Sequence, residues 1–498
     1  MTPDTRRRER WGVTGLVASL AAAMVLAPLL RKETLTIAIH QGVEGVALRT
    51  LAEQFSHERN VAVEVFELPY DALYAAEQAQ IVEPTSKFDV VMVDDPWLPA
   101  LIGEDGPGGG TRLDRLRFTE EDCRALELSD FVESTLQVSL HPAVQKVHIR
   151  PAASAGPFTC DDPFFALPFV GNSQLFVTRA DLQPATWDEV MALTLKAAES
   201  GDAGYVARVG AGNSVVTDFM PILWSHMDPR YAAEVQTGGP GDVHDPLARS
   251  DDKQGMAALE FLRALGDRAE ANRGVVSVDD FDLTVQLVQK QASMSIAWAA
   301  WVMAIAKLPQ PYNTLLTGLD RNGHTRLNVT QVPGEPVLGA WLLAIPARSA
   351  RKDLAQEFLV FATSRERIIQ AARRGNPPPR RSAFADQDLA AMYAFFPKQL
   401  ESLERARMRP RTPLWRDIEH VLGECLTTLY ENVITTREAW ERVEAGLDPI
   451  RDKERRIAQV RATPAPGGQA ADEATTVASE IRSILDEPLG EFSCQQPR

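Results

Sequence analysis

The side chains best suited to chemistry in this sequence are two adjacent carboxylates, Asp94 and Asp95. A pair of carboxyl groups can hydrolyse a glycosidic bond when one serves as the acid and the other as nucleophile or base. Adjacent residues of an extended segment point to opposite sides, however, which is poor geometry for two groups that must face one bond. The sequence also contains no GxSxG, no HExxH, no phosphate-loop motif and no histidine pair at i, i+4. We therefore expect no catalytic residue.

The four cysteines, Cys123, Cys160, Cys425 and Cys494, are widely spaced. None lies in a CxxC motif or beside a histidine at metal-ligand spacing, so we expect neither a metal site nor a cofactor. If the protein is exported, one or two disulfides can form, and Cys123–Cys160 is the pair that we favour. The alternative is that all four are ordinary thiols.

Three short strands position the first group of polar residues. Residues 35–39, 61–65 and 88–93 are apolar or alternate as strands do, and helical segments separate them. This order predicts crossover units and a mainly parallel sheet, in which ligands bind outside the carboxyl ends of the strands. The dipeptide His-Gln at 40–41 follows the first strand, and Asp-Asp-Pro-Trp at 94–97 follows the third. These two groups should therefore converge.

The composition is that of a large globular protein. The chain has 498 residues, of which 45% are apolar and 24% charged, and this length allows two to four domains or a duplicated architecture. The formal net charge of −16 argues against a general binder of nucleic acid or of anionic membranes, because nothing broadly offsets phosphate charge. We therefore expect no nucleic-acid partner.

The N-terminus has the signature of an export signal. Several arginines precede an uncharged run at 11–30, and Arg31 and Lys32 follow it. The run is also long enough to span the hydrocarbon core of a membrane. Residues 1–32 are therefore a signal peptide or an uncleaved membrane anchor, and a buried core helix is the remaining alternative. We expect the rest of the chain to be periplasmic or extracellular, with 461–498 as a polar tail.

Nine segments follow one another in a characteristic order. They are LRTLAEQFSHE, FDVVMVDDPW, FALPFVGNSQLFVTRADL, PATWDEV, GMAALEFLRAL, KQASMSIAWAAWV, VPGEPVLGAWLLAIPARSARKDLAQEFLVFATS, GNPPPRRSAF and RPRTPLWRDIEHVLGECLTTLYENVITTREAW. In this order they resemble the extracellular solute-binding proteins of ABC importers, specifically the sugar-binding, maltodextrin-binding-like group. The resemblance covers about residues 33–460. The chain departs from the family in a longer stretch at 101–164, in Gly339-Ala340 where two glycines are usual, and in its extra tail.

The resemblance implies an α/β, two-lobe periplasmic-binding-protein-like fold with mainly parallel sheets, hinged by crossing strands. Ligand contacts from both lobes exist together only when the cleft is shut, so a ligand shifts an open–closed equilibrium. The expected first lobe comprises 33–168 plus 300–338, and the second comprises 174–297 plus 346–460. The expected crossings lie near 169–177, 294–298 and 339–345.

The resemblance also implies a cleft whose polar and aromatic side chains bind a sugar. Sugars present a rim of hydroxyls and flat C–H faces, which carboxylates, amides and aromatic rings can contact. Close backbone approach at glycine and an arginine fork are further means of binding. The substrate-binding candidates are Asp94, Asp95, Trp298, Asn172, Asn213, Gly339, Ala340, His40, Gln41, Trp97, Trp224, Trp301, Arg380 and Arg381, and Trp341 belongs to the same aromatic group.

The sequence thus predicts an exported solute-binding component of an ABC importer. We expect it to act as a monomer that captures a carbohydrate or polyol by closure of two lobes and delivers it to the transmembrane permease subunits. An alternative is a membrane-tethered sensor or scaffold with the same fold, which an uncleaved run at 11–30 would favour. A glycoside-active enzyme is the least favoured alternative.

Overall fold

The computed structural model describes most of the chain from residue 33 to residue 494. The described residues are 33–79, 85–102, 112–140, 158–179, 182–199, 204–210, 212–227, 252–271, 279–289, 293–309, 315–316, 327–462 and 470–494. The expected signal peptide or anchor at 1–32 lies outside them. Within these ranges, no helix has both the length and the apolar character that a membrane span requires.

The first lobe is built around a five-stranded sheet with the order β2-β1-β3-β8-β4. Its three N-terminal strands confirm the strands predicted from the sequence, and β1 pairs in parallel with both β2 and β3. β8 then inserts between β3 and β4 and is antiparallel to both. The strand bounds are β1 Thr34–His40, β2 Ala62–Leu68, β3 Val90–Asp94, β4 Ala166–Val170 and β8 Trp341–Ala344.

The second lobe holds a smaller sheet with the order β6-β5-β7, in which both pairings are antiparallel. The bounds are β5 Gln174–Arg179, β6 Met294–Trp298 and β7 Leu327–Thr330. The expectation of mainly parallel sheets is therefore wrong for the described strands. The reason is that β5 and β8 each enter their sheet directly from the other lobe, and such a passage does not require the helical crossover that a parallel pair needs.

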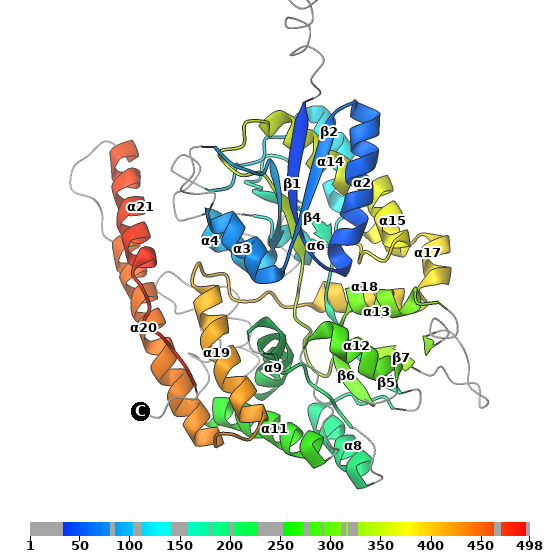
Figure 1. Cartoon of the computed structure of the whole chain (residues 1–498), viewed down its shortest axis with the longest axis vertical. Helices are drawn as coiled ribbons and strands as arrows, with labels where there is room; N and C mark the ends of the chain where they lie inside the picture. Colours follow the sequence, from blue (N-terminus) through cyan, green and yellow to red (C-terminus); the bar gives the residue numbers. More distant parts are fainter. Residues whose placement is uncertain are drawn as a thin grey trace, which may run out of the picture.

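Helices enclose both sheets (Figure 1). In the first lobe, α2 packs on β1 and β2, and α14 packs on α2 and β4. In the second lobe, α9, α11, α19 and α20 pack on one another. The helix bounds are α2 Val43–Arg59, α3 Tyr70–Ala79, α4 Leu98–Ile102, α5 Glu120–Leu126, α6 Glu133–Gln137, α8 Trp187–Glu199, α9 Asn213–His226, α11 Asp252–Ala271, α12 Asp280–Val288, α13 Ala299–Ala306, α14 Lys352–Thr363, α15 Arg365–Arg373, α16 Arg381–Phe384, α17 Gln387–Met392, α18 Phe396–Arg405, α19 Trp415–Tyr430, α20 Thr436–Ala462 and α21 Ala470–Asp486; short 3-10 turns lie at Asp95–Trp97 and Leu128–Asp130.

Two segments lie in a different lobe from the one expected. β7 falls within 300–338, which was assigned to the first lobe, but it pairs with β5 in the sheet of the second lobe. α14 and α15 fall within 346–460, which was assigned to the second lobe, but they pack against α2 of the first lobe. In each case the amphipathic pattern identifies the element, whereas the apolar surface that it covers is set by the tertiary fold.

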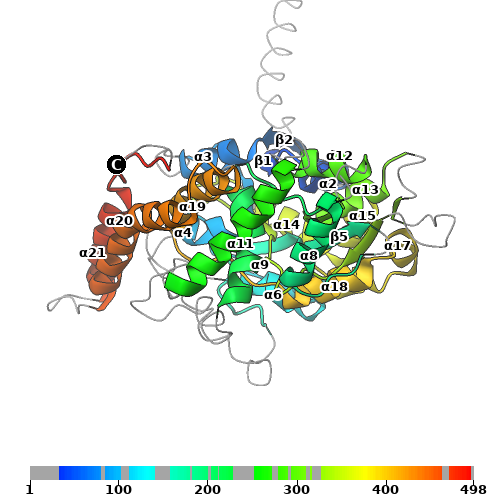
Figure 2. The same cartoon turned by 90° about the horizontal axis from the view of Figure 1, so that it is seen from below.

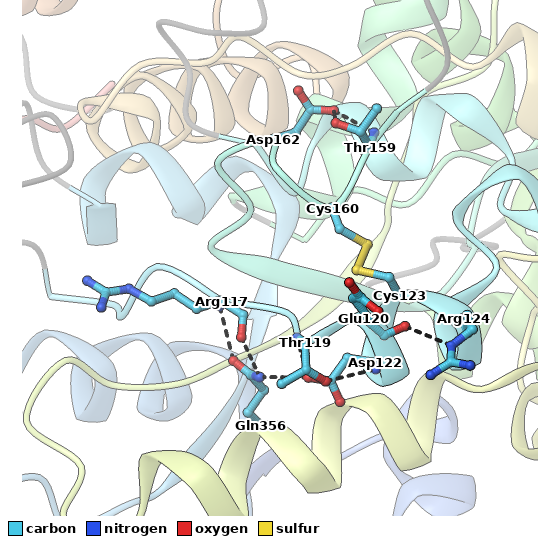
Figure 3. Close-up of a disulfide and its surroundings, with 10 residues drawn as sticks. All are labelled: Arg117, Thr119, Glu120, Asp122, Cys123, Arg124, Thr159, Cys160, Asp162 and Gln356. Atoms are coloured by element: carbon cyan, nitrogen blue, oxygen red, sulfur yellow. Dashed lines mark hydrogen bonds between the residues drawn. A yellow bond between two sulfur atoms is a disulfide. The ribbon is translucent and has the colours of Figure 1, made fainter.

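Both cysteine pairs form disulfides, and the predicted pair Cys123–Cys160 is confirmed. Figure 3 shows this bond beside Gln356 of α14, whose side-chain amide exchanges two hydrogen bonds with the backbone of Arg117. These bonds tie the irregular segment that follows α4 to the body of the first lobe.

The second disulfide, Cys425–Cys494, fixes the end of the described chain to α19. The expected polar tail includes α21, which packs against α20 through Ile457, Ile481 and Ile484. Figure 2 shows α20 and α21 together at one side of the molecule. The tail is therefore an ordered part of the second lobe wherever the structure describes it.

Candidate ligand-binding site

A cavity of about 600 Å³ lies between the two lobes, at the carboxyl ends of β1, β3 and β6. A volume of this size is typical of a small-molecule site. Both lobes contribute to its wall. The lining residues are His40, Gln41, Gly42, Glu44, Tyr70, Asp71, Asp94, Asn172, Gly212, Asn213, Ser214, Asp279, Asp280, Phe281, Trp298, Trp301, Gly339, Trp341, Arg409, Arg416, Glu419, His420 and Glu424.

Aromatic rings form part of the wall. The imidazole of His40 stacks on the indole of Trp341, with ring centroids 4.6 Å apart and planes 12° from parallel. The indole of Trp298 packs against the backbone of Gly339, so closely that a Cβ at this glycine would lie 2.7 Å from the ring. Such flat apolar surfaces suit the C–H faces of a hydroxylated ring, and the absence of a side chain at Gly339 leaves room for the indole.

Asp94 is held in a buried network at the end of β3. Its carboxylate accepts a hydrogen bond of 2.7 Å from the Tyr70 hydroxyl and two from the Arg409 guanidinium, at 2.6 and 3.0 Å. Asp95 accepts 2.9 Å bonds from Arg409 and from the backbone N–H of Ala340. Burial raises the pKa of Asp95 to about 6, although Arg409 opposes the rise. One arginine therefore forms ion pairs with two carboxylates beneath the cavity.

Direct contacts join the lobes beside this network. The Asn213 side-chain amide of α9 donates to the Tyr70 hydroxyl and to Glu419, each at 3.1 Å. Arg416 of α19 donates to Asp71 at 2.5 Å, and its guanidinium lies 5.3 Å from the centre of the Tyr70 ring. These pairs cross from α3 to α9 and α19, so the cavity is closed at this side by the protein itself.

Eight of the fourteen predicted binding residues line this cavity. They are His40, Gln41, Asp94, Asn172, Asn213, Gly339, Trp298 and Trp301, and Trp341 of the same aromatic group joins them. The remaining six do not line it. They are Asp95, Ala340, Trp97, Trp224, Arg380 and Arg381.

Each of these six residues has another structural setting. Asp95, Ala340 and Trp97 are fully buried behind the wall. Trp224 packs in the apolar core of the second lobe. Arg380 is buried in the first lobe, where it donates to the carbonyls of Leu126 and Thr363, whereas Arg381 pairs with Glu404 at the surface.

Sequence reasoning missed several groups that line the cavity. Those with a clear structural role are Glu44, Tyr70, Asp280, Arg409, Arg416 and Glu419. Among them, Arg409 lies in RPRTPLW, where a cationic run next to apolar and proline residues is the available signal. The others lie within ordinary amphipathic helices and carry no such signal. Among the described residues, no group of three histidine, cysteine or acidic side chains could hold a metal ion.

The comparison with protein families identifies the chain. Residues 41–367 match the model of the bacterial extracellular solute-binding proteins. The chain belongs to this family. Members of this family bind solutes outside the cytoplasm. The cavity between the two lobes is therefore the candidate solute-binding site.

Individual relatives are distant in sequence but share the fold. The chain is 20% identical to maltose-bound MalE3 of T. maritima, with a TM-score of 0.66 over 84% of this chain and 99% of that one. It is 18% identical to an ABC transporter solute-binding protein of Agrobacterium radiobacter K84 in complex with ribitol, with a TM-score of 0.62 over 85% of this chain and 98% of that one. A curated relative from Sinorhizobium fredii, described as a probable amino-acid ABC transporter periplasmic-binding protein, is 21% identical over 72% of this chain and 75% of its own length.

Proposed function

We propose that this solute-binding protein captures a hydroxylated small molecule, a carbohydrate or polyol, in the cavity between its lobes. The observation that carries the proposal is the composition of the wall, where tryptophans and an amide-and-carboxylate network surround about 600 Å³. The structural relatives support this ligand class, since their descriptions name maltose, ribitol, tagatose and mannitol as bound ligands.

The mechanism is binding and closure without chemistry on the solute. The carboxylate of Asp94 is fully engaged by Tyr70 and Arg409. It therefore orients groups of the wall. A solute that contacts His40 of the first lobe and Trp298 of the second stabilises only the shut form. The shut form is the species that we expect the permease subunits of an ABC importer to recognise, and residues 11–30 would export or anchor the protein.

Intrinsic tryptophan fluorescence tests the proposal directly, because Trp298, Trp301 and Trp341 line the cavity. Ribitol, mannitol, tagatose and maltose are titrated into the full mature chain, and at least one should shift the emission saturably. Trp298→Ala should weaken that response. Trp440→Ala is the matched control, because Trp440 lies on α20 away from the cavity wall. No saturable response to any carbohydrate or polyol would contradict the proposed function.

Mass spectrometry of small molecules released from the purified protein provides an independent test. A co-purified polyhydroxyl compound supports the proposal. A co-purified ligand without hydroxyls, such as an apolar amino acid, would contradict it.

A further inference from the structure

The cavity wall is more acidic than a neutral sugar requires. Seven carboxylates line it, whereas only two guanidinium groups do. Both of these arginines are already paired with carboxylates, Arg409 with Asp94 and Asp95, and Arg416 with Asp71 and Glu419. Neither of these arginines forms an ion pair with Glu44 or Asp280, which also line the cavity.

Glu44 is the clearest of these carboxylates. It lies in the first turn of α2 and is only 6% exposed, yet it lines the cavity. It accepts no hydrogen bond from any described residue, and its nearest polar contact is the Nδ1 of His40 at 3.7 Å. That nitrogen is itself buried without a hydrogen-bond partner. The Glu44 carboxylate opens onto the cavity and receives no hydrogen bond from the described residues, so a cationic ligand group is its natural complement.

Asp280 faces the same region from the second lobe. It begins α12, and the Arg208 guanidinium donates 2.8 Å to its Oδ1. Arg208 is shared with the buried carboxylate of Asp218, so this group of three keeps a net negative charge. Burial raises the pKa of Asp280 to about 6 against the effect of Arg208, and the charges of Asp218 and Glu44 add to the rise. Glu44 and Asp280 therefore repel each other across the cleft.

Two aromatic side chains complete this side of the wall. Phe281, next to Asp280, is 62% exposed, and its ring lies edge-on to the indole of Trp301 with centroids 6.4 Å apart. Both residues line the cavity. Aromatic faces beside carboxylates are the surroundings in which proteins bind organic ammonium groups.

We propose that the captured solute carries a protonated amine in addition to its hydroxyls, and that this ammonium group lies between Glu44 of the first lobe and Asp280 of the second. The solute class is then an amino sugar or an amino polyol. This inference rests on the proposed function and makes it narrower. Lobe closure brings two like charges together unless a cation separates them, so the amine both binds the wall and permits closure. A bare metal cation is a poor alternative, because the described residues offer no three-ligand cluster.

Paired ligands test the inference on the full mature chain. D-glucosamine, D-galactosamine and glucamine are compared by calorimetry with glucose, galactose and sorbitol, which replace the amine by a hydroxyl. At least one amine should bind about 10- to 100-fold more tightly than its neutral counterpart, as expected when a charged group is hydrogen-bonded. Glu44→Gln should remove most of that preference, because it should weaken binding of the amine more than binding of its neutral counterpart.

Matched variants on the same helices control for non-specific effects. Glu53→Gln changes an exposed carboxylate of α2, and Asp282→Asn changes a carboxylate of α12 outside the cavity wall. Neither should alter the preference, whereas Asp280→Asn should reduce it. Equal or tighter binding of the neutral sugars overturns this inference and leaves the proposed function standing. If no member of either half of the panel binds, this inference is overturned, and the fluorescence titrations with ribitol, mannitol, tagatose and maltose decide the proposed function separately.

Discussion

Asn213 of α9 donates a 3.1 Å hydrogen bond to the hydroxyl of Tyr70 on α3, and this bond joins the two lobes beside the cavity. Tyr70 in turn donates to Asp94, so the contact between the lobes continues into the buried network at the end of β3. The position of the second lobe is thus linked to a residue that lines the site of the first. We therefore expect a movement of the second lobe to change the arrangement of the cavity wall as well.

Removing the amide of Asn213 should weaken closure. Asn213→Ala removes the bonds to Tyr70 and Glu419, and a hydrogen bond of this kind contributes about 1 kcal/mol. We expect roughly 3- to 10-fold weaker binding of any solute that the native protein binds, together with a larger radius of gyration in small-angle scattering. Asn328→Ala on β7, outside the cavity wall, is the control. Native affinity and an unchanged radius in Asn213→Ala would show that the contact does not hold the shut form.

A methyl group at Gly339 should displace Trp298. The added Cβ would lie 2.7 Å from the indole, closer than two carbon atoms can approach. Gly339→Ala should therefore lower solute affinity about tenfold and the free energy of unfolding by about 1–3 kcal/mol. Gly490→Ala, where no atom lies within 4 Å of the added Cβ, should change neither quantity. Unchanged fluorescence titrations of Gly339→Ala would exclude Trp298 as a binding surface.

Arg409 should be essential for stability because it forms ion pairs with two buried carboxylates. Arg409→Met leaves Asp94 and Asp95 buried without their cation, and the loss of one partner of a buried ion pair costs about 3–5 kcal/mol. The folded-state pKa of Asp95, already raised to about 6, should rise further. The folded state then binds more protons than the unfolded state, so the stability of the variant should fall as pH rises from 5 to 8.

Chemical denaturation of Arg409→Met and of the native protein at pH 5 and pH 8 measures how the free energy of unfolding changes with pH. Arg405 is exposed on α18, so Arg405→Met provides a control for the loss of an arginine. A pH-independent loss of stability in Arg409→Met would contradict the role of the two carboxylates.

Amine binding should depend on pH through Asp280. Burial raises its pKa to about 6, Arg208 opposes the rise, and the charges of Asp218 and Glu44 add to it. Asp280 loses its negative charge as the pH falls through this value, so the affinity for an amino sugar should fall between pH 7 and pH 5. The affinity for the neutral counterpart should stay constant.

The variant Asp280→Asn tests whether Asp280 itself causes the pH dependence of amine binding. If Asp280 is responsible, the variant should show weak amine binding at pH 7 and a flatter pH profile. A variant profile parallel to that of the native protein would exclude Asp280 as the group responsible for the pH dependence.

The disulfide Cys425–Cys494 should stabilise the second lobe and hold the chain that follows α21. It closes a separation of 69 residues, and removal of such a cross-link costs roughly 2–4 kcal/mol. The double variant Cys425→Ala, Cys494→Ala should unfold at a lower temperature and expose residues 487–494 to limited proteolysis. The pair Cys123→Ala, Cys160→Ala removes the other disulfide and should leave this segment protected. Cleavage at the same rate in both variants would contradict this role.

Local patterns predicted the elements of the first lobe well. Apolar runs and alternation identified β1, β2 and β3, because burial of a strand leaves a period that can be recognised in a single segment. The parallel pairing of these strands also brought His40 and Asp94 to one edge, as predicted. The amphipathic stripe of α19 has the same local origin.

Asp94 and Asp95 show what local sequence patterns cannot predict. Asp94 lies opposite Trp341 in the pairing of β3 with β8 and faces the cavity, whereas Asp95 binds the backbone N–H of Ala340 beneath it. The register that separates the two carboxylates comes from a strand almost 250 residues later in the chain. No property of the DD dipeptide distinguishes them.

The amino-acid sequence by itself determined the family, the elements and one edge of the site, because those depend on short-range periodicity and on the order of segments. The tertiary structure decided which lobe β7 and α14 join, which of the fourteen candidates line the cavity, and that Glu44 and Asp280 line it together. These features arise when surfaces far apart in the chain are buried together, and the charge balance of a cavity exists only after that burial.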